Sequence, residues 1–190
     1  TNDAVVSNIQ TGTKQALYQD KTSVVLETEA GATLSFKELP WNGEWMHGYV
    51  FVDYNNDEVF DNTTELVSYN FYSEAGNSTG QNSKGETVSN NCGVKATNMP
   101  SWTLPSDLSG EVRMRFNIAW NSINPCGYAE MKDNAGCMCD ITLQIGEPTA
   151  TRTISVSATP AEAGTVTING EAVESVTAEG TIILDATPAA

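Results

Sequence analysis

The sequence contains no run of about 18 apolar residues, so a membrane-spanning helix is not expected. It also has no basic segment followed by an apolar one, which argues against a signal peptide. Basic side chains are scarce, because 9 Lys and Arg stand against 24 Asp and Glu and give a net charge of −15. This charge repels phosphate backbones and excludes nucleic acid as a partner. It attracts divalent cations, or it serves solubility alone.

Histidine is almost absent, since His47 is the only one. Serine or cysteine catalysis needs a base beside the nucleophile, and the segment WMHGY around His47 offers no recognisable partner. We therefore interpret His47 as a structural residue at the start of a strand. A glycosidase needs two carboxylates at a fixed separation, and no motif points to such a pair. We expect no enzymatic activity.

Cysteine is sparse but even in number, with Cys92, Cys126, Cys137 and Cys139. The even count favours two disulfides in an oxidising compartment. Zinc fits less well, because only one residue separates Cys137 from Cys139 and His47 is distant in sequence. On a strand these two cysteines share one face, so each is expected to pair with Cys92 or Cys126. Which pairs with which stays open.

β alternation, in contrast, is plentiful, and it is clearest in EVRMRFNIAW at residues 111–120. Every second residue there is apolar, which predicts a half-buried strand with one wet face. The apolar side consists of Val112, Met114, Phe116, Ile118 and Trp120. On the wet side, Arg113 and Arg115 are expected to form surface ion pairs with acids such as Glu111 or Asp140.

Several further short strands are expected between clusters of Gly, Asn, Ser and Pro. They lie at residues 23–28, 33–36, 47–53, 66–72 and 140–145. This pattern predicts an all-β fold, an antiparallel β-sandwich of Ig-like or jelly-roll-like type, over residues 1–146.

Composition changes after Gly146, where residues 147–152 read as a linker. Residues 153–190 contain no aromatic side chain, and SATPA at 157–161 returns as DATPA at 185–189. Such a repeat is typical of arrays of small β units, which rarely form a large core alone. We expect a small β-repeat module that is cut short. The chain opens at Thr1 without Met, so we also expect a mature or trimmed form of a longer protein.

The stretch DYNNDEVFD at residues 53–61 follows an apolar run and carries oxygen-bearing side chains at alternate positions. Calcium takes six to eight such oxygens, and a loop of this spacing can curl around it. The candidate ligands are Asp53, Asn55, Asp57, the Val59 carbonyl, Asp61 and Glu65. Glu58 stands where an EF-hand loop needs Gly, so a strand-to-strand calcium turn fits better. The alternative is an Asx-rich hairpin without metal.

Aromatic residues suggest two roles. Trp41 and Trp45, in the segment WNGEW, are expected to lie in a loop and could stack on a sugar. Core packing is the alternative for both. For Phe51, Phe71 and Trp120, whose positions fall on predicted strands, core packing is favoured.

Residues 18–145 resemble the GEVED domain of secreted bacterial proteins. The resemblance is carried, in the family's order, by YQD, YVFVDYNNDEVFDNTTEL, WTLPSDLSGEVRMRFNIAW, NPCG and GCMCDITLQI. The last segment takes the place of the name-giving motif, but Cys137 and Cys139 stand where the family has two glutamates. Only Asp140 of that acidic cluster remains. The departure implies that a disulfide replaces a polar or metal-based crosslink.

Residues 153–188 resemble the bacterial β-repeats related to internalin B-repeats, which implies a spacer in a long surface protein. The resemblances imply a secreted or cell-surface location and no catalysis. With the oxygen-rich loop, the cysteines and the tryptophans, they lead us to expect a non-catalytic adhesion or binding module, calcium-stabilised and disulfide-linked, with a glycan or a host or matrix protein as partner. Two alternatives are a purely structural spacer and an accessory domain of a secreted hydrolase.

Overall fold

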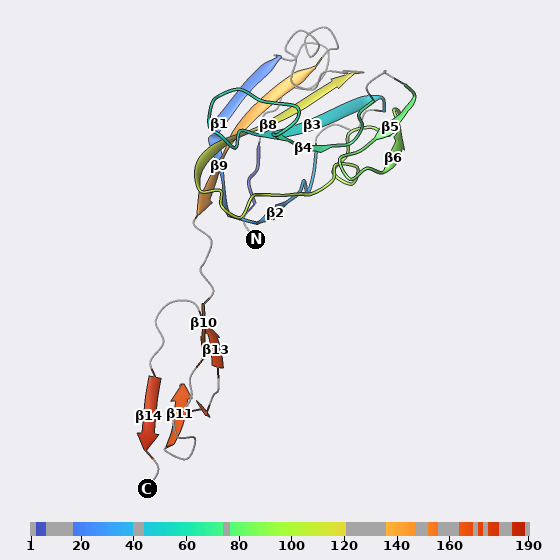
Figure 1. Ribbon diagram of the computed structural model, residues 1–190. Helices are drawn as coiled ribbons and strands as arrows, with labels where there is room; N and C mark the ends of the chain where they lie inside the picture. Colours follow the sequence, from blue (N-terminus) through green and yellow to red (C-terminus); the bar gives the residue numbers. More distant parts are fainter. Residues whose placement is uncertain are drawn as a thin grey trace. The chain divides into compact units, whose positions relative to one another are not determined.

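The computed structural model describes residues 3–6, 17–39, 44–73, 77–120 and 136–146, and the backbone of short strands between residues 152 and 188 (Figure 1). The chain divides into two compact units, Thr1–Pro148 and Thr149–Ala190. The described ranges consist of strands, turns and irregular segments, and none of them contains a helix that could cross a membrane.

The first unit is built on a five-stranded sheet with the order β1-β9-β8-β3-β4. Its strands are β1 (Tyr18–Glu29), β9 (Cys137–Gly146), β8 (Gly110–Trp120), β3 (Met46–Val52) and β4 (Leu66–Tyr69). Two small antiparallel pairs accompany it, β2 (Thr33–Leu34) with β7 (Trp102–Thr103) and β5 (Thr79–Gln81) with β6 (Thr87–Ser89). The predicted all-β, sandwich-type fold is confirmed. One pair departs from the antiparallel pattern, because β1 runs parallel to β9.

One side of this sheet, here the inner face, carries the main hydrophobic core. Val112, Met114, Phe116 and Ile118 of β8 are all buried, as the alternation predicted. The β2–β7 pair and the segment that follows β6 cover them, and Figure 1 shows β2 beneath the sheet. Phe36 joins the two layers, since its ring centroid lies 5.7 Å from that of Trp102 and 5.1 Å from that of Phe116.

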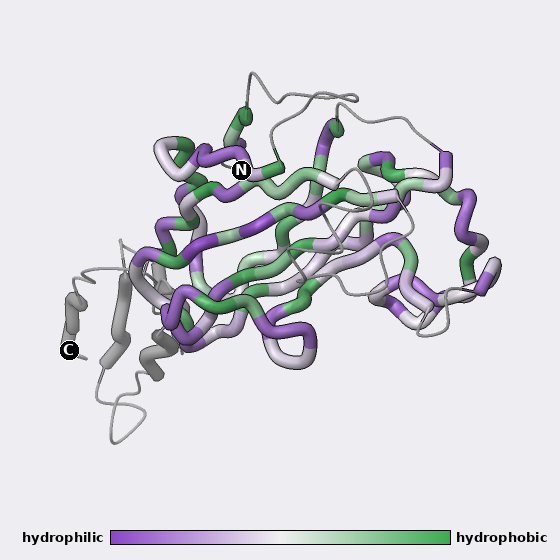
Figure 2. Tube along the Cα trace, turned by 90° about the horizontal axis from the view of Figure 1, so that it is seen from above, coloured by the Kyte–Doolittle hydropathy of each residue, from purple (hydrophilic) through white to green (hydrophobic). Residues whose placement is uncertain are grey.

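The opposite side, here the outer face, is wet only in part. A second, smaller core of Tyr49, Phe51, Phe60, Ala119 and Met138 packs on it. On β8 the residues of this face pass from exposed Glu111 through half-buried Arg113 and Arg115 to Asn117 and Ala119, both 0% exposed. The predicted wet face therefore holds at one end of β8 and is wrong at the other. Figure 2 shows the alternation of hydrophobic and hydrophilic residues along these strands.

The prediction that Trp120 fills the core is wrong, because its side chain is 53% exposed. Trp120 is the last residue of β8 and pairs with Met46, the first residue of β3. It keeps the alternation of the strand but lies beyond the buried stretch. Phe51 and Phe71 are buried, as expected.

The second unit consists of short paired strands. β10 (Arg152–Ser155) is antiparallel to β13 (Ser175–Ala178). β11 (Gly164–Ile168) lies between β12 (Glu171–Ala172) and β14 (Leu184–Pro188). The second copy of the repeat falls largely in β14, and the first copy, at 157–161, lies outside the described residues.

Candidate functional site

The acidic segment 53–65 forms a closed loop between β3 and β4. Its ends are joined by the Val52 amide, which donates to the Glu65 carbonyl at 3.1 Å. Phe60, in the middle of the loop, is buried against the outer face, with its ring centroid 5.7 Å from that of Phe51. The Arg115 guanidinium lies 4.3 Å from the Phe60 ring centroid on the same face. An apolar anchor and a cation–π contact therefore hold this polar loop on the sheet.

Asp53 organises the first half of the loop from a buried position, with 1% of its surface exposed. Its carboxylate accepts hydrogen bonds from the amides of Asp57 at 3.2 Å and Glu58 at 3.0 Å. The backbone turns sharply to bring these two amides to the Asp53 carboxylate, with φ of 60° at Asn56 and 66° at Glu58. Glu58 thus adopts the left-handed conformation at the position where an EF-hand loop has Gly, and it does so with a side chain that disfavours it.

Glu65 organises the second half and is 2% exposed. Its two oxygens accept the amides of Tyr54 and Asp61, each at 3.1 Å. Burial raises the pKa of Glu65, and the nearby Asp53 carboxylate raises it further, while the amide donors lower it. Two buried carboxylates therefore face the same loop backbone, and the Asp53 charge makes the ionised form of Glu65 less favourable.

The remaining predicted ligands form exposed local turns. The side-chain Oδ1 of Asn55 accepts the Asp57 amide at 3.0 Å, and the Asp57 carboxylate accepts the Val59 amide at 2.8 Å. Asp61 accepts the amides of Thr63 and Thr64, which lower its pKa. These contacts are those of an Asx-rich turn. In the described ranges no three His, Cys, Asp or Glu side chains form a group that could hold a metal, so a cation here would also need amide and carbonyl oxygens.

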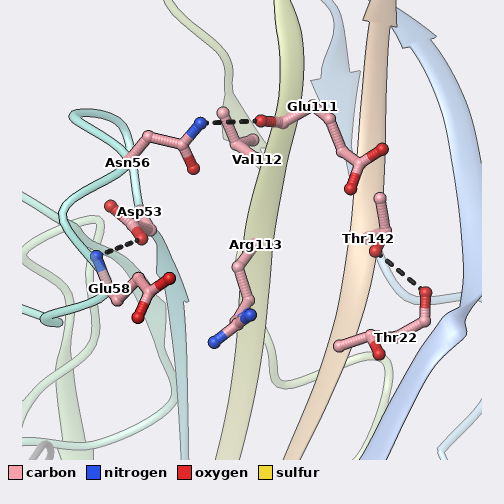
Figure 3. Close-up of a pocket in the computed structure, with 8 residues that line it drawn as sticks. All are labelled: Thr22, Asp53, Asn56, Glu58, Glu111, Val112, Arg113 and Thr142. Atoms are coloured by element: carbon pink, nitrogen blue, oxygen red, sulfur yellow. Dashed lines mark hydrogen bonds between the residues drawn. The ribbon is translucent and has the colours of Figure 1, made fainter.

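A polar cleft of about 400 Å³ lies between this loop and β8 (Figure 3). The Asn56 amide group donates to the Glu111 carbonyl at 3.1 Å across one side, and Thr142 donates to the Thr22 carbonyl at 2.9 Å on the other. Arg113 extends between these groups toward Glu58 in Figure 3. The ion pairs found among the described residues leave Arg113 out, so its predicted pairing with Glu111 or Asp140 is not seen.

Arg115 does pair with Asp140, through two hydrogen bonds of 2.7 and 2.9 Å. The expectation of an ordinary surface pair is wrong, because Asp140 is 0% exposed. The Tyr18 hydroxyl donates to the same carboxylate at 3.2 Å, and Phe60 covers the guanidinium. The pair is largely covered, with the Arg115 side chain 21% exposed, because the loop folds back over it. The local sequence around β8 does not reveal this.

Of the two tryptophans proposed for ligand binding, the structure describes only Trp45. Trp45 precedes β3, is 44% exposed and has a φ of 64°. A bulky residue in this conformation is unusual and strained. Trp41 lies outside the described residues. Sequence reasoning missed Trp120, which is exposed at the same end of the β3–β8 pair.

Cys92, Cys137 and Cys139 are free thiols in the structure, and Cys126 lies outside the described residues, so the two disulfides stay a prediction. Cys137 and Cys139 are buried on the inner side of β9, sharing a face as expected. Gln19 donates to the Cys137 sulfur at 3.1 Å. Burial raises the pKa of Cys139 to about 12, which keeps this thiol protonated and unreactive.

His47 is buried in β3, stacked on Phe71 with 4.5 Å between ring centroids. Its Nε2 lies 3.1 Å from the Asn90 carbonyl, and its Nδ1 has no hydrogen-bond partner among the described residues. Burial lowers the pKa of His47. These surroundings are those of a packed, neutral imidazole, in keeping with the structural role expected for it.

Comparison with known protein families gives a match for the first unit. Residues 47–136 match the family model of the GEVED domain, from the start of β3 to the residue before β9. The match includes the loop 53–65 and bears out the first part of the resemblance. It stops short of Cys137, where the chain departs from the name-giving motif. Neither the curated proteins nor the solved structures yielded a match.

Proposed function

We propose that the first unit is a non-catalytic, calcium-stabilised adhesion or binding module of a secreted or surface-exposed bacterial protein. The GEVED match of residues 47–136 agrees with the family resemblance from which this proposal starts. The second unit, by its repeat and its small paired strands, is proposed as a β-repeat spacer that carries the module within a longer surface protein.

The observation that carries the calcium proposal is the burial of Asp53 and Glu65, at 1% and 2% exposure, in one loop. Three more carboxylates, Asp57, Glu58 and Asp61, crowd the same segment. The ion pairs in the described part of the chain involve none of these five acids. Their mutual repulsion favours a bound cation.

The chemistry of the loop fits calcium better than other metals. Carboxylate oxygens, the Asn55 amide oxygen and the Val59 carbonyl are hard donors, and the described loop offers no histidine or cysteine. Calcium accepts such mixed oxygen sets in flexible geometry, whereas magnesium demands a near-ideal octahedron. The residues that would hold it are Asp53, Asn55, Asp57, Val59, Asp61 and Glu65.

The ligand is proposed to be a glycan or a host or matrix protein, held in part by Trp45 and Trp41. Support comes from Trp45, which is exposed and held in a strained backbone conformation. Such strain is often found at binding sites.

Chelation tests the calcium proposal. Calcium at about one hundred times its dissociation constant stabilises a folded protein by about 2.7 kcal/mol, so a chelator should lower the melting temperature clearly. Asp57→Ala should abolish this sensitivity, because it removes one ligand from an exposed turn. Asp107→Ala, which removes an exposed acid outside the loop, is the matched control and should keep it. Identical melting curves with and without chelator would refute the proposal.

A further inference from the structure

A second cleft, of about 440 Å³, lies at the edge of the sheet beside β4. Tyr69 and Tyr72 line it with Leu66, and Asn62, Thr63 and Ser83 supply neutral polar groups. The two tyrosine rings meet edge to face, 6.1 Å apart at 65°. Both rings are half-buried, so each is fixed by packing and still reaches solvent.

Backbone contacts hold the walls of this cleft in place. Tyr72 exchanges two hydrogen bonds with Gln81, of 2.8 and 3.0 Å, and the Ser83 amide donates to the Tyr69 carbonyl at 3.0 Å. The approach of β5 to Tyr72 requires glycine at position 80, since a Cβ there would lie 2.3 Å from the Tyr72 carbonyl oxygen. The geometry of the two rings is therefore set by the fold rather than chosen on binding.

The lining indicates the class of ligand. Every residue that lines the cleft is uncharged, and the chain as a whole carries a net charge of −15. A phosphate, sulfate or carboxylate would find no basic side chain here and a repulsive field around it. A purely apolar ligand would cover the Thr63 and Ser83 hydroxyls without offering them a hydrogen-bond partner. What fits is a neutral molecule with C–H faces for the rings and hydroxyls for the polar side chains.

We infer that this cleft binds a neutral pyranose unit of a glycan. One tyrosine ring would stack on the C–H face of the sugar, and Asn62, Thr63 and Ser83 would hydrogen-bond its hydroxyls. The inference rests on the proposed binding function but places a site apart from Trp45. It also connects to the loop, because Asn62 and Thr63 lie between Asp61 and Glu65, and Asp61 holds the Thr63 amide at 2.8 Å.

The experiment is a glycan array with the full chain in millimolar calcium, followed by calorimetric titration with the neutral oligosaccharide that binds best. Tyr72→Ala should weaken binding by about tenfold or more, equivalent to about 1.4 kcal/mol. Ser83→Ala and Thr63→Val keep both rings and should each weaken it by a smaller factor. Val25→Ala, which changes an exposed residue at the opposite edge of the sheet, should leave the affinity unchanged, and Trp45→Ala tests the other proposed binding site. Melting curves of every variant show whether a loss of binding reflects unfolding.

Three results would overturn the inference. One is the absence of any neutral glycan ligand. Another is binding confined to charged glycans. The last is affinity that survives Tyr72→Ala, Ser83→Ala and Thr63→Val but is lost in Trp45→Ala, which would leave the proposed function standing with its ligand at Trp45. The calcium proposal is tested separately, by the melting curves with and without chelator.

Discussion

The two faces of the five-stranded sheet are stabilised in different ways. The inner face is covered by a large, almost wholly apolar core, to which β8 and β9 contribute alternate residues. The outer face has a small core, a buried Arg115–Asp140 ion pair and an acidic loop folded over both. The inner face needs only hydrophobic packing, whereas the outer face depends on charges that must remain paired. The difference suggests that stability resides mainly in the inner face and responsiveness to ions and pH in the outer one.

The largest effect is expected from breaking the buried ion pair. Arg115→Met leaves the fully buried Asp140 carboxylate without its cation, and removal of one partner of such a pair typically costs about 3–5 kcal/mol. The double variant Arg115→Met with Asp140→Leu should recover most of that loss, because no charge is then buried. Urea unfolding of the native protein, the single variant and the double variant measures both the loss and the recovery in the free energy of unfolding. If the double variant is as unstable as Arg115→Met, the ion pair itself makes a net contribution to stability. The loss in Arg115→Met would then not come from leaving the Asp140 charge unpaired.

The inner face should respond to a loss of volume instead. Leu143 is 0% exposed in the main core, and Leu143→Ala should cost about 2–5 kcal/mol through lost contacts and a residual cavity. The cost should not change with calcium, since Leu143 packs on the face away from the loop. Urea unfolding with calcium and with chelator provides the measurement. A calcium-dependent cost would mean that the two faces are coupled.

The smallest effect is expected from pH. Burial lowers the pKa of His47 below its usual 6.5, so the unfolded chain takes up this proton more readily than the folded one. The stability associated with His47 is therefore complete above 6.5 and is lost as the pH falls from there toward the folded pKa. Melting temperatures across this window should decline in the native protein and stay flatter in His47→Gln. Equal slopes in the two proteins would contradict the prediction.

Glu65, in the loop over the outer face, affects the pH dependence of stability in the opposite direction to His47. Its pKa is raised, so the folded state takes up this proton more readily, and the carboxylate proposed as a calcium ligand is neutralised at higher pH than an ordinary glutamate. The chelator-sensitive part of the melting temperature should shrink as the medium is acidified. This loss of chelator sensitivity can be separated from the His47 effect, because the His47→Gln variant should still show it.

Several strands were predictable from alternating apolar residues or from short apolar runs bounded by turn residues. The alternation in residues 111–120 corresponds to β8, and the predicted segments 47–53 and 140–145 fall almost entirely within β3 and β9. The pairing of β1 with β9 was not predictable, because a parallel pair between strands so far apart leaves no local signature. The exposure of Trp120 was missed for a similar reason, since alternation says which side a residue takes but not where the covering layer ends.

In the candidate site, too, features that depend on local contacts were predictable and features that depend on tertiary contacts were not. The oxygen-rich loop could be recognised from the spacing of Asp53, Asn55 and Asp57, because its contacts are local. The role of Phe60 and the burial of Asp140 depend on where the loop folds, which no short segment encodes. The cleft at Tyr69 and Tyr72 likewise joins residues 62–83 through tertiary contacts, although both tyrosines were visible as aromatic residues.

The parallel pairing of β1 and β9 has a mechanical consequence. Tyr18 lies opposite Met138 at one end of the pair, and Glu29 lies opposite Gly146 at the other. Tension applied at Tyr18 and at Gly146 would slide the two strands along each other, so the hydrogen bonds between them would share the load instead of opening one by one. A module tethered at these points would resist pulling through the arrangement of its terminal strands, whatever its resistance to heat.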